Sequence, residues 1–253
     1  MILHHQIQQH SSDLTPIVFI HGLFGSLSNL GMLARHYVGQ RTVIQFDVRN
    51  HGLSPHIEEM NYQAMAQDII DSLDALNVEK VVVIGHSMGG KISMALAALS
   101  PERIEKLIVL DMAPFEYKEQ HHDQIFKALF AVEQAKISSR ADATALMSQY
   151  IHENMVIQFL LKSFNQGTWR FNLGALFQHY ADILSWHNQT DVNIKTLFLK
   201  GEHSFYISTA QHFAAIDSQF SRSTVVVIEN AGHWLHAEKT ETVIQEIDQF
   251  LTT

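Results

Sequence analysis

Cysteine is absent from this chain of 253 residues. A chain without cysteine forms no disulfide and offers no thiolate, so a disulfide-stapled fold and a cysteine nucleophile are both excluded. The absence suits a reducing compartment, and we expect a cytoplasmic protein. The stretch from Met1 to Asp13 is rich in His and Gln and lacks a basic segment followed by an apolar one, so we expect no signal peptide.

Basic residues are also scarce, since 17 Lys and Arg stand against 26 Asp and Glu and give a net charge of −9. A nucleic-acid partner is therefore not expected, because such proteins need a basic face. No apolar run reaches the roughly 18 residues of a membrane span, so we expect no membrane insertion. The 46% of hydrophobic residues can form the core of one domain, with or without an insertion. Oligomeric state is left open.

Short apolar runs alternate with helical patterns along most of the chain. This alternation is typical of an α/β fold with a mostly parallel, doubly wound sheet, in which buried strands read as continuous apolar runs. Helical spacing is found in Tyr62–Leu76, Met88–Leu99 and Ala237–Leu251. The predicted strands are Ile17–Ile20, Thr42–Phe46, Lys80–Ile84, Leu107–Leu110, Thr196–Leu199 and Thr224–Ile228.

Residues 114–186 break this alternation and contain no buried-strand pattern. Amphipathic helices are predicted there at Gln120–Ala135, Ala141–Tyr150 and Met155–Lys162. A helical block between two strands of one sheet indicates an inserted lid. We therefore expect residues 1–113 and 187–253 to form one core and residues 114–186 to form the lid.

The sequence Gly85-His86-Ser87-Met88-Gly89 matches G-x-S-x-G. In the α/β-hydrolase fold this motif is the nucleophile elbow, a sharp turn from strand to helix that exposes the serine hydroxyl. A predicted strand precedes the motif and a predicted helix follows it, as the elbow requires. The glycines allow the turn, because a Cβ atom there would clash. Ser87 is the predicted nucleophile.

A serine nucleophile needs a general base, and the chain has 17 histidines from which to choose. His233 lies after the last predicted strand and before the final helix, where the chain order Ser, acid, His of this fold places the base. The histidine pairs His4-His5 and His121-His122 do not have metal-ligand spacing, and H-E-x-x-H is absent. We expect no metal and no cofactor.

The third member of the predicted triad is an acid that orients the histidine. Its usual place follows the penultimate strand, but Ser204 stands there, and Glu202 lies on the wrong residue of the turn. Asp111 follows the preceding strand, which is a known alternative position in this fold. Asp111 is therefore the predicted acid, while Asp47 is expected to order the loop after the second strand.

The oxyanion hole of this fold uses two backbone N–H groups. One belongs to the residue after the nucleophile, Met88. The other comes from the loop after the first core strand, His21-Gly22-Leu23-Phe24-Gly25, where Leu23 is preferred and Phe24 is its neighbour.

At this point the chain resembles the α/β-hydrolase superfamily along its whole length, and within it the YbfF-type esterases. The segments that carry this resemblance are HGLFGSLSNLG, DVRNHGLSP, GHSMGGK, GHWLHAEK and the lid stretches Phe159–Phe164 and Trp169–Asn172. The resemblance implies hydrolysis of carboxylic esters and acyl-CoA thioesters, and it implies an acid after the earlier strand, in agreement with Asp111.

These residues together predict a serine esterase or thioesterase that works through an acyl-enzyme. Phe24, Trp169, Phe171 and Trp234 are the expected substrate-binding residues, although Trp234 fits core packing equally well. Two alternatives stay open. One is a different reaction on the same triad, such as perhydrolysis or C–C bond hydrolysis, and the other is a catalytically silent binding protein with this fold.

Overall fold

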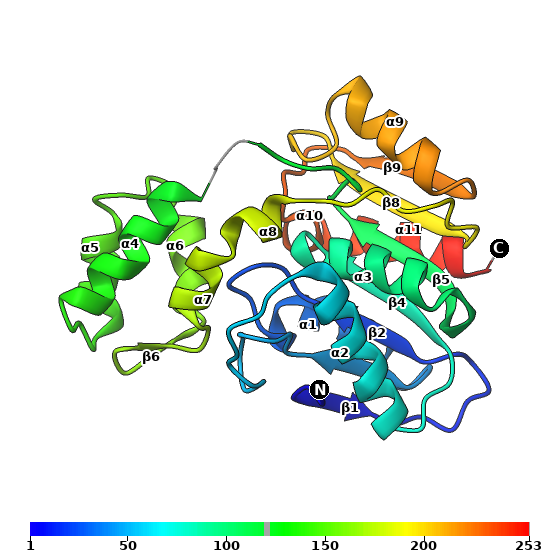
Figure 1. The fold of residues 1–253 in the computed structure, drawn as a ribbon, viewed down its shortest axis with the longest axis horizontal. Coiled ribbons are helices and arrows are strands. Elements are labelled where there is room, and N and C mark those ends of the chain that lie inside the picture. Colours follow the sequence, from blue (N-terminus) through cyan, green and yellow to red (C-terminus); the bar gives the residue numbers. More distant parts are fainter. Residues whose placement is uncertain (119–121, 253) are drawn as a thin grey trace.

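The computed structural model describes residues 1–118 and 122–252 and contains a seven-stranded sheet with the order β1-β3-β2-β4-β5-β8-β9 (Figure 1). All neighbouring strands pair in parallel except β1, which runs antiparallel to β3 at the edge. The predicted α/β-hydrolase fold is thus confirmed. The strands of this sheet are β1 (His5–Gln8), β2 (Ile17–Ile20), β3 (Val43–Phe46), β4 (Val81–His86), β5 (Ile104–Leu110), β8 (Thr196–Gly201) and β9 (Ser223–Ile228).

The strand register brings the functional edge of the sheet together. Ile20 pairs with Gly85, and His86 pairs with Leu110, so β2, β4 and β5 end at the same level. β2, β3 and β4 are buried along their whole length, because apolar side chains on both of their faces pack against helices. The residues that follow these strands therefore emerge side by side at the carboxyl edge.

Helices cover both faces of the sheet and form two apolar layers. The layer with α2 and α3, seen in front of the sheet in Figure 1, also receives buried residues of α9, while α1, α10 and α11 pack on the opposite face. The bounds are α1 (Gly31–Tyr37), α2 (Tyr62–Ala75), α3 (Met88–Leu99), α9 (Ala210–Gln219), α10 (Leu235–Glu238) and α11 (Thr240–Thr252), with 3-10 turns η1 (Leu27–Leu30) and η2 (Pro101–Arg103).

Between β5 and β8 the chain forms a group of short helices at one end of the molecule, on the left of Figure 1. The helix that the sequence predicts from Gln120 begins at Asp123 within the described residues. Residues 119–121, which include Gln120, lie outside the described part of the chain. The division of the chain into core and lid stays a prediction. The elements of this segment are α4 (Asp123–Gln134), α5 (Arg140–Met147), α6 (Asn154–Leu161), β6 (Phe164–Asn165), β7 (Thr168–Trp169), α7 (Leu173–Gln178) and α8 (Tyr180–Leu184).

Some elements differ from the sequence prediction. The sequence pattern did not indicate β1, because this edge strand is polar and only partly buried. The helices α1 and α9 were not predicted either. The final helix, expected to run from Ala237, is divided at Lys239, whose φ of −136° and ψ of 49° end α10 before α11 begins.

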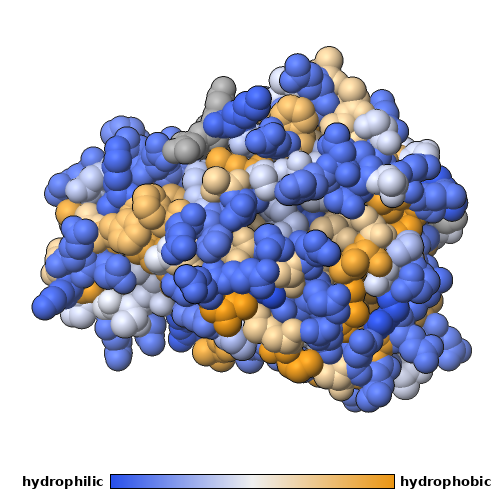
Figure 2. Space-filling view, in the orientation of Figure 1, coloured by the Kyte–Doolittle hydropathy of each residue, from blue (hydrophilic) through white to orange (hydrophobic). Residues whose placement is uncertain are grey.

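The outer surface carries mainly polar side chains. On the face drawn in Figure 2, hydrophilic residues dominate, and hydrophobic ones show between them in patches. None of the helices in residues 1–118 and 122–252 has the length and apolar character needed to cross a membrane.

Candidate active site

Ser87 lies in the sharp turn between β4 and α3, with a φ of 55° and a ψ of −121°. This backbone conformation is unfavourable for a residue with a side chain, and strain of this kind is concentrated at functional sites. The turn is possible because Gly85 and Gly89 have no Cβ atom. A Cβ on Gly85 would lie 2.2 Å from the Gly89 oxygen, and one on Gly89 would lie 2.2 Å from the Ile20 oxygen. Glycine is therefore required on both sides of Ser87.

His233 lies in the loop after β9 and reaches both predicted partners. Its Nε2 is 3.0 Å from the Ser87 Oγ, and its Nδ1 is 2.7 Å from the Asp111 Oδ2. The ring of Tyr206 packs against the imidazole with 4.1 Å between the ring centroids. The Nε2–H of His86 donates to the backbone oxygen of His233 at 2.9 Å, which fixes the loop from its backbone side.

Asp111 is completely buried at the end of β5 and has a positive φ of 54°. Its Oδ1 accepts a hydrogen bond from the Gly201 N–H at 2.9 Å, and its Oδ2 accepts one from the Ser204 hydroxyl as well as from His233. A carboxylate that accepts several hydrogen bonds is stabilised in its charged form. The buried negative charge of Asp111 is therefore well satisfied.

The rival acids have other partners. Asp47 accepts hydrogen bonds from the N–H groups of Leu27 at 2.7 Å and Leu53 at 2.9 Å, so it orders its own loop, as expected. Glu202 accepts from the Asn230 N–H at 2.8 Å and is exposed.

Ser204 has a contact that the sequence analysis missed. It stands where this fold usually places the acid, and the sequence showed only that a carboxylate was missing there. In the structure its hydroxyl reaches back to Asp111 across neighbouring strand ends. The position of Ser204 was the one signal for this contact in the sequence. A small hydroxyl that follows one strand can donate to a carboxylate that follows the preceding strand.

The two predicted oxyanion donors come from the loop after β2, which contains Leu23, and from the start of α3. Met88 is the first residue of α3, and the first N–H groups of a helix have no partner within the helix. The N–H of Phe24 is already engaged, because it donates to the Nε2 of His51 at 3.1 Å. Within residues 1–118 and 122–252, neither Leu23 nor Met88 has a hydrogen-bond acceptor for its N–H.

A cleft lies in front of Ser87 and His233. Phe24 and Trp234, both predicted substrate-binding residues, line it. Its apolar wall is contributed by the loop after β2, by α4, by α6 and by the loop of the base, and consists of Leu23, Phe24, Leu30, Ile125, Val156, Phe159, Leu160 and Trp234.

Trp169 and Phe171 were also expected to bind substrate, but the structure does not bring them to this cleft. The two rings stack on each other with 5.3 Å between centroids, and Phe171 packs behind Phe24 at 5.2 Å. Both side chains are buried in the main apolar cluster. Their aromatic character therefore reflects core packing behind the cleft wall, whereas Phe159 of α6 faces Trp234 at the cleft itself.

Neutral histidines surround the catalytic groups. Burial lowers the pKa of His86 well below its usual range, and the neighbouring His236 lowers it further. Burial likewise lowers the pKa of His236 to about 3. The rings of these two histidines lie 4.3 Å apart.

In the described part of the chain, no group of three or more metal-ligating side chains could hold a metal ion.

Known proteins resemble this chain along nearly its whole length. It is 47% identical to "Esterase YbfF" of Escherichia coli over 97% of this chain and 96% of that protein. It is 35% identical to mouse "sn-1-specific diacylglycerol lipase ABHD11" over 98% of this chain and 85% of that protein. The solved structure "Marine microorganism esterase" superposes with a TM-score of 0.93 at 33% identity, covering 98% and 99% of the two chains. The model of the α/β-hydrolase fold family matches residues 15–240, and this chain therefore belongs to that family.

Proposed function

We propose that this protein is a serine esterase in which Ser87, His233 and Asp111 form the catalytic triad. The observation that carries the proposal is the unbroken series of hydrogen bonds from the Ser87 Oγ through the His233 ring to Asp111, at 3.0 Å and 2.7 Å, beside an apolar cleft. Ester hydrolysis is supported by the relatives, which are named as esterases and lipases.

In the acylation step the Nε2 of His233 takes the proton of Ser87 as the oxygen attacks the acyl carbonyl. The Nδ1–H of His233 donates to Asp111, whose charge stabilises the imidazolium that forms. The N–H groups of Leu23 and Met88 donate to the developing oxyanion. The protonated His233 then gives its proton to the departing alcohol or thiol, which leaves an ester on Ser87.

Deacylation uses the same groups. His233 takes a proton from a water molecule as the water oxygen attacks the acyl carbon, and the same N–H groups hold the second oxyanion. When the bond to the Ser87 oxygen breaks, His233 returns the proton to that oxygen. The products are a carboxylic acid and the free enzyme, and no metal or cofactor enters the scheme.

The acyl group is the part of the substrate that the cleft recognises in this proposal. Support comes from the cleft wall, which is mostly aliphatic and aromatic. We propose both carboxylic esters and acyl-CoA thioesters as substrates, because the triad attacks the same carbonyl in both. Residues 114–186 act as a lid, and their support is that α4 and α6 supply part of that wall.

A panel of acyl esters and acyl-CoA thioesters of rising chain length tests the proposal, with Ser87→Ala as the matched control. We expect wild-type turnover of at least one series and none above background for Ser87→Ala, with an unchanged circular-dichroism spectrum. Turnover that survives in Ser87→Ala would contradict the proposal. Peroxide and diketone substrates in the same panel test perhydrolysis and C–C bond hydrolysis, and inactivity on every substrate would favour a silent binding protein. The cytoplasmic location stays a prediction that cell fractionation tests.

A further inference from the structure

We infer that His51 is a positioning residue, which holds the loop of residues 21–25 so that the Leu23 N–H points to the oxyanion. This inference rests on the proposed function and concerns a histidine outside the triad. His51 belongs to the loop after β3, is completely buried and does not line the cleft. It can therefore act only through the groups that its ring contacts.

Both ring nitrogens of His51 have backbone partners. The Phe24 N–H donates to Nε2 at 3.1 Å, so Nε2 is unprotonated, and Nδ1–H donates to the Arg49 oxygen at 2.9 Å. The two contacts specify one neutral tautomer. Burial, reinforced by the neighbouring His21, lowers the pKa of His51 to about 3, so the acceptor stays available at neutral pH.

The bond from Phe24 matters because the loop is strained at that residue. Phe24 has a φ of 61°, which is unfavourable for a residue with a side chain, and the Gly25 N–H closes the turn onto the Gly22 oxygen at 3.1 Å. Such a conformation persists only when its surroundings hold it. By accepting from Phe24, His51 fixes the peptide next to Leu23 and leaves the Leu23 N–H for the substrate.

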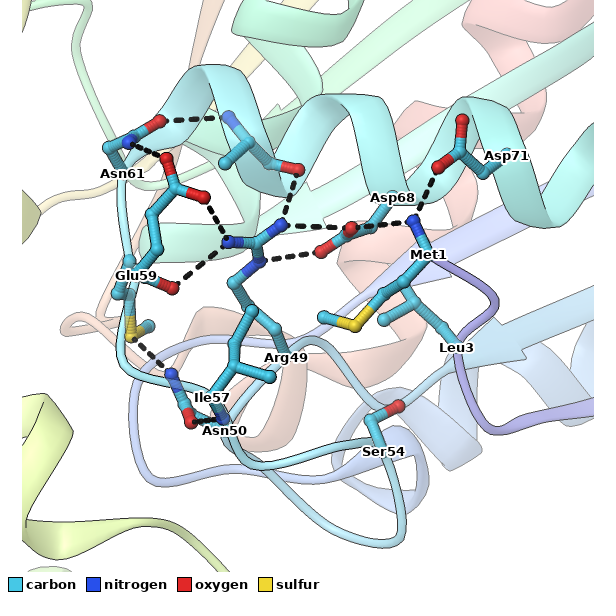
Figure 3. A network of polar contacts seen from close by, with 12 residues as sticks. Met1, Leu3, Arg49, Asn50, Ser54, Ile57, Glu59, Asn61, Asp68 and Asp71 are labelled. Atoms are coloured by element: carbon cyan, nitrogen blue, oxygen red, sulfur yellow. Dashed lines mark hydrogen bonds and ion pairs between the residues drawn. The ribbon is translucent and has the colours of Figure 1, made fainter.

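The other side of His51 is anchored in α2. Figure 3 shows the Arg49 guanidinium between Asp68 and the chain at Glu59, with bonds of 2.6 Å and 2.9 Å to the Asp68 carboxylate and 2.9 Å to the Glu59 oxygen. The Met1 amino group also reaches Asp68, at 3.1 Å. The ion pair holds Arg49, the Arg49 carbonyl holds His51, and His51 holds Phe24.

The segment 114–186 covers this arrangement from outside. The Asn172 N–H donates to the Asn50 oxygen at 2.9 Å, and Phe171 makes a β-bridge with His51. The ring of Phe171 also packs on Phe24. His51 is thus enclosed between the loop that it holds and the segment behind it, which gives its acceptor atom a fixed position.

Two amide substitutions distinguish the roles of the two ring nitrogens of His51. In His51→Asn the short amide can replace Nδ1 toward the Arg49 oxygen but does not reach Phe24. In His51→Gln the longer amide oxygen can accept from the Phe24 N–H. Asp47→Asn is the control, because Asp47 follows the same strand as His51 but accepts hydrogen bonds from the N–H groups of Leu27 and Leu53 instead of that of Phe24.

The measurements are kcat, KM and the inhibition constant of a trifluoromethyl ketone, which forms a tetrahedral oxyanion adduct with an active serine. A donor displaced by about 1 Å can cost about 10²-fold in rate, so we expect kcat of His51→Asn to fall by about that factor with little change in KM. Ketone affinity should fall in parallel, because the adduct resembles the transition state. We expect His51→Gln to keep most of the wild-type kcat and ketone affinity. Asp47→Asn should melt at a lower temperature, with its ketone affinity unchanged.

Several outcomes overturn the inference. One is a folded His51→Asn whose ketone affinity equals that of the wild type. Another is a folded His51→Gln whose kcat and ketone affinity fall as far as those of His51→Asn. If His51→Asn does not fold, the losses of His51→Gln are measured against the wild type, and losses as large as those expected for His51→Asn overturn the inference. A wild-type enzyme that forms no ketone adduct on Ser87 would instead contradict the proposed function, so the two failures are distinguishable.

Discussion

At the scale of single residues, Asp111 is the member of the proposed triad that the sequence placed least directly. Its assignment rests on a 2.7 Å contact with the His233 Nδ1 and on complete burial. We predict that Asp111→Asn lowers kcat by about 10⁴-fold, because the amide favours the wrong histidine tautomer. Steady-state kinetics on the best ester measures this loss. Asp47→Asn should mainly lower the melting temperature. A larger kcat loss in Asp47→Asn than in Asp111→Asn would show that Asp47, and not Asp111, is the acid of the triad.

Ser204 supports Asp111 by donating to the same oxygen that His233 contacts. A hydrogen bond to a charged group contributes about 1.5 kcal/mol, so we predict roughly a tenfold lower kcat for Ser204→Ala. Ser208→Ala is the control, since its hydroxyl on the same loop donates to the Phe205 oxygen at 2.7 Å and is exposed. Equal kinetics for the two variants would show that Ser204 does not support the acid.

The residues predicted from sequence share one property, which is a fixed place at the end of a strand. Parallel strands end at one edge, so Ser87 and Asp111 had to lie close together once β4 and β5 were recognised. The contacts of Ser204, His86 and His51 could not be predicted in this way. They depend on how loops distant in sequence pack, and hydrophobic periodicity carries no information about that packing.

At the scale of elements, α6 brings Phe159 to the cleft and to Trp234, with 5.6 Å between the ring centroids. We predict that Phe159→Ala shifts the preferred acyl chain length, because it enlarges the acyl side of the cleft, whereas turnover of the shortest ester changes less. The chain-length profile of kcat/KM measures the shift.

Phe171→Leu is the matched control for that experiment, since Phe171 lies behind the cleft wall and is only 2% exposed. This variant should melt at a lower temperature and keep the wild-type profile. A profile changed by Phe171→Leu and not by Phe159→Ala would restore the original expectation that Phe171 contacts substrate.

The end of α8 is fastened to α3 by Lys91, which is 1% exposed and donates to the Leu184 and Ser185 oxygens, both at 2.9 Å. Burial lowers the pKa of Lys91 from 10.5 to about 7. Above that pH the unfolded chain binds more protons at this lysine than the folded chain, so its contribution to the free energy of unfolding rises with pH toward 10.5.

We therefore predict that the difference in unfolding free energy between wild type and Lys91→Met shifts in favour of the wild type as pH rises from about 7 to about 9. Urea titrations of both proteins at several pH values measure this difference. A difference that stays constant across the range would show that Lys91 keeps its ordinary pKa in the folded protein.

At the scale of the whole molecule, the alternation of buried strands and helices predicted the mostly parallel sheet, and the G-x-S-x-G motif with its resemblance predicted the fold family. Continuous apolar runs such as β2 and β4 carry a strong signal because both of their faces are covered. The edge strand β1 and the segment 114–186 were harder, since polar edges and short helices depend on tertiary contacts for their form. Trp169 and Phe171 illustrate this, because their places depend on tertiary contacts: Phe171 packs on Phe24 and bridges to His51, and the Trp169 Nε1–H donates to the Leu129 oxygen at 3.3 Å.

The proposed mechanism requires a covalent intermediate at Ser87, and a fluorophosphonate probe followed by peptide mass mapping tests this requirement most directly. The mechanism predicts one adduct per chain, located on Ser87. It also predicts labelling that is greatly slowed in His233→Ala and Asp111→Asn, although both variants remain folded. An adduct on another residue, or labelling of Ser87 that does not depend on His233, would contradict it.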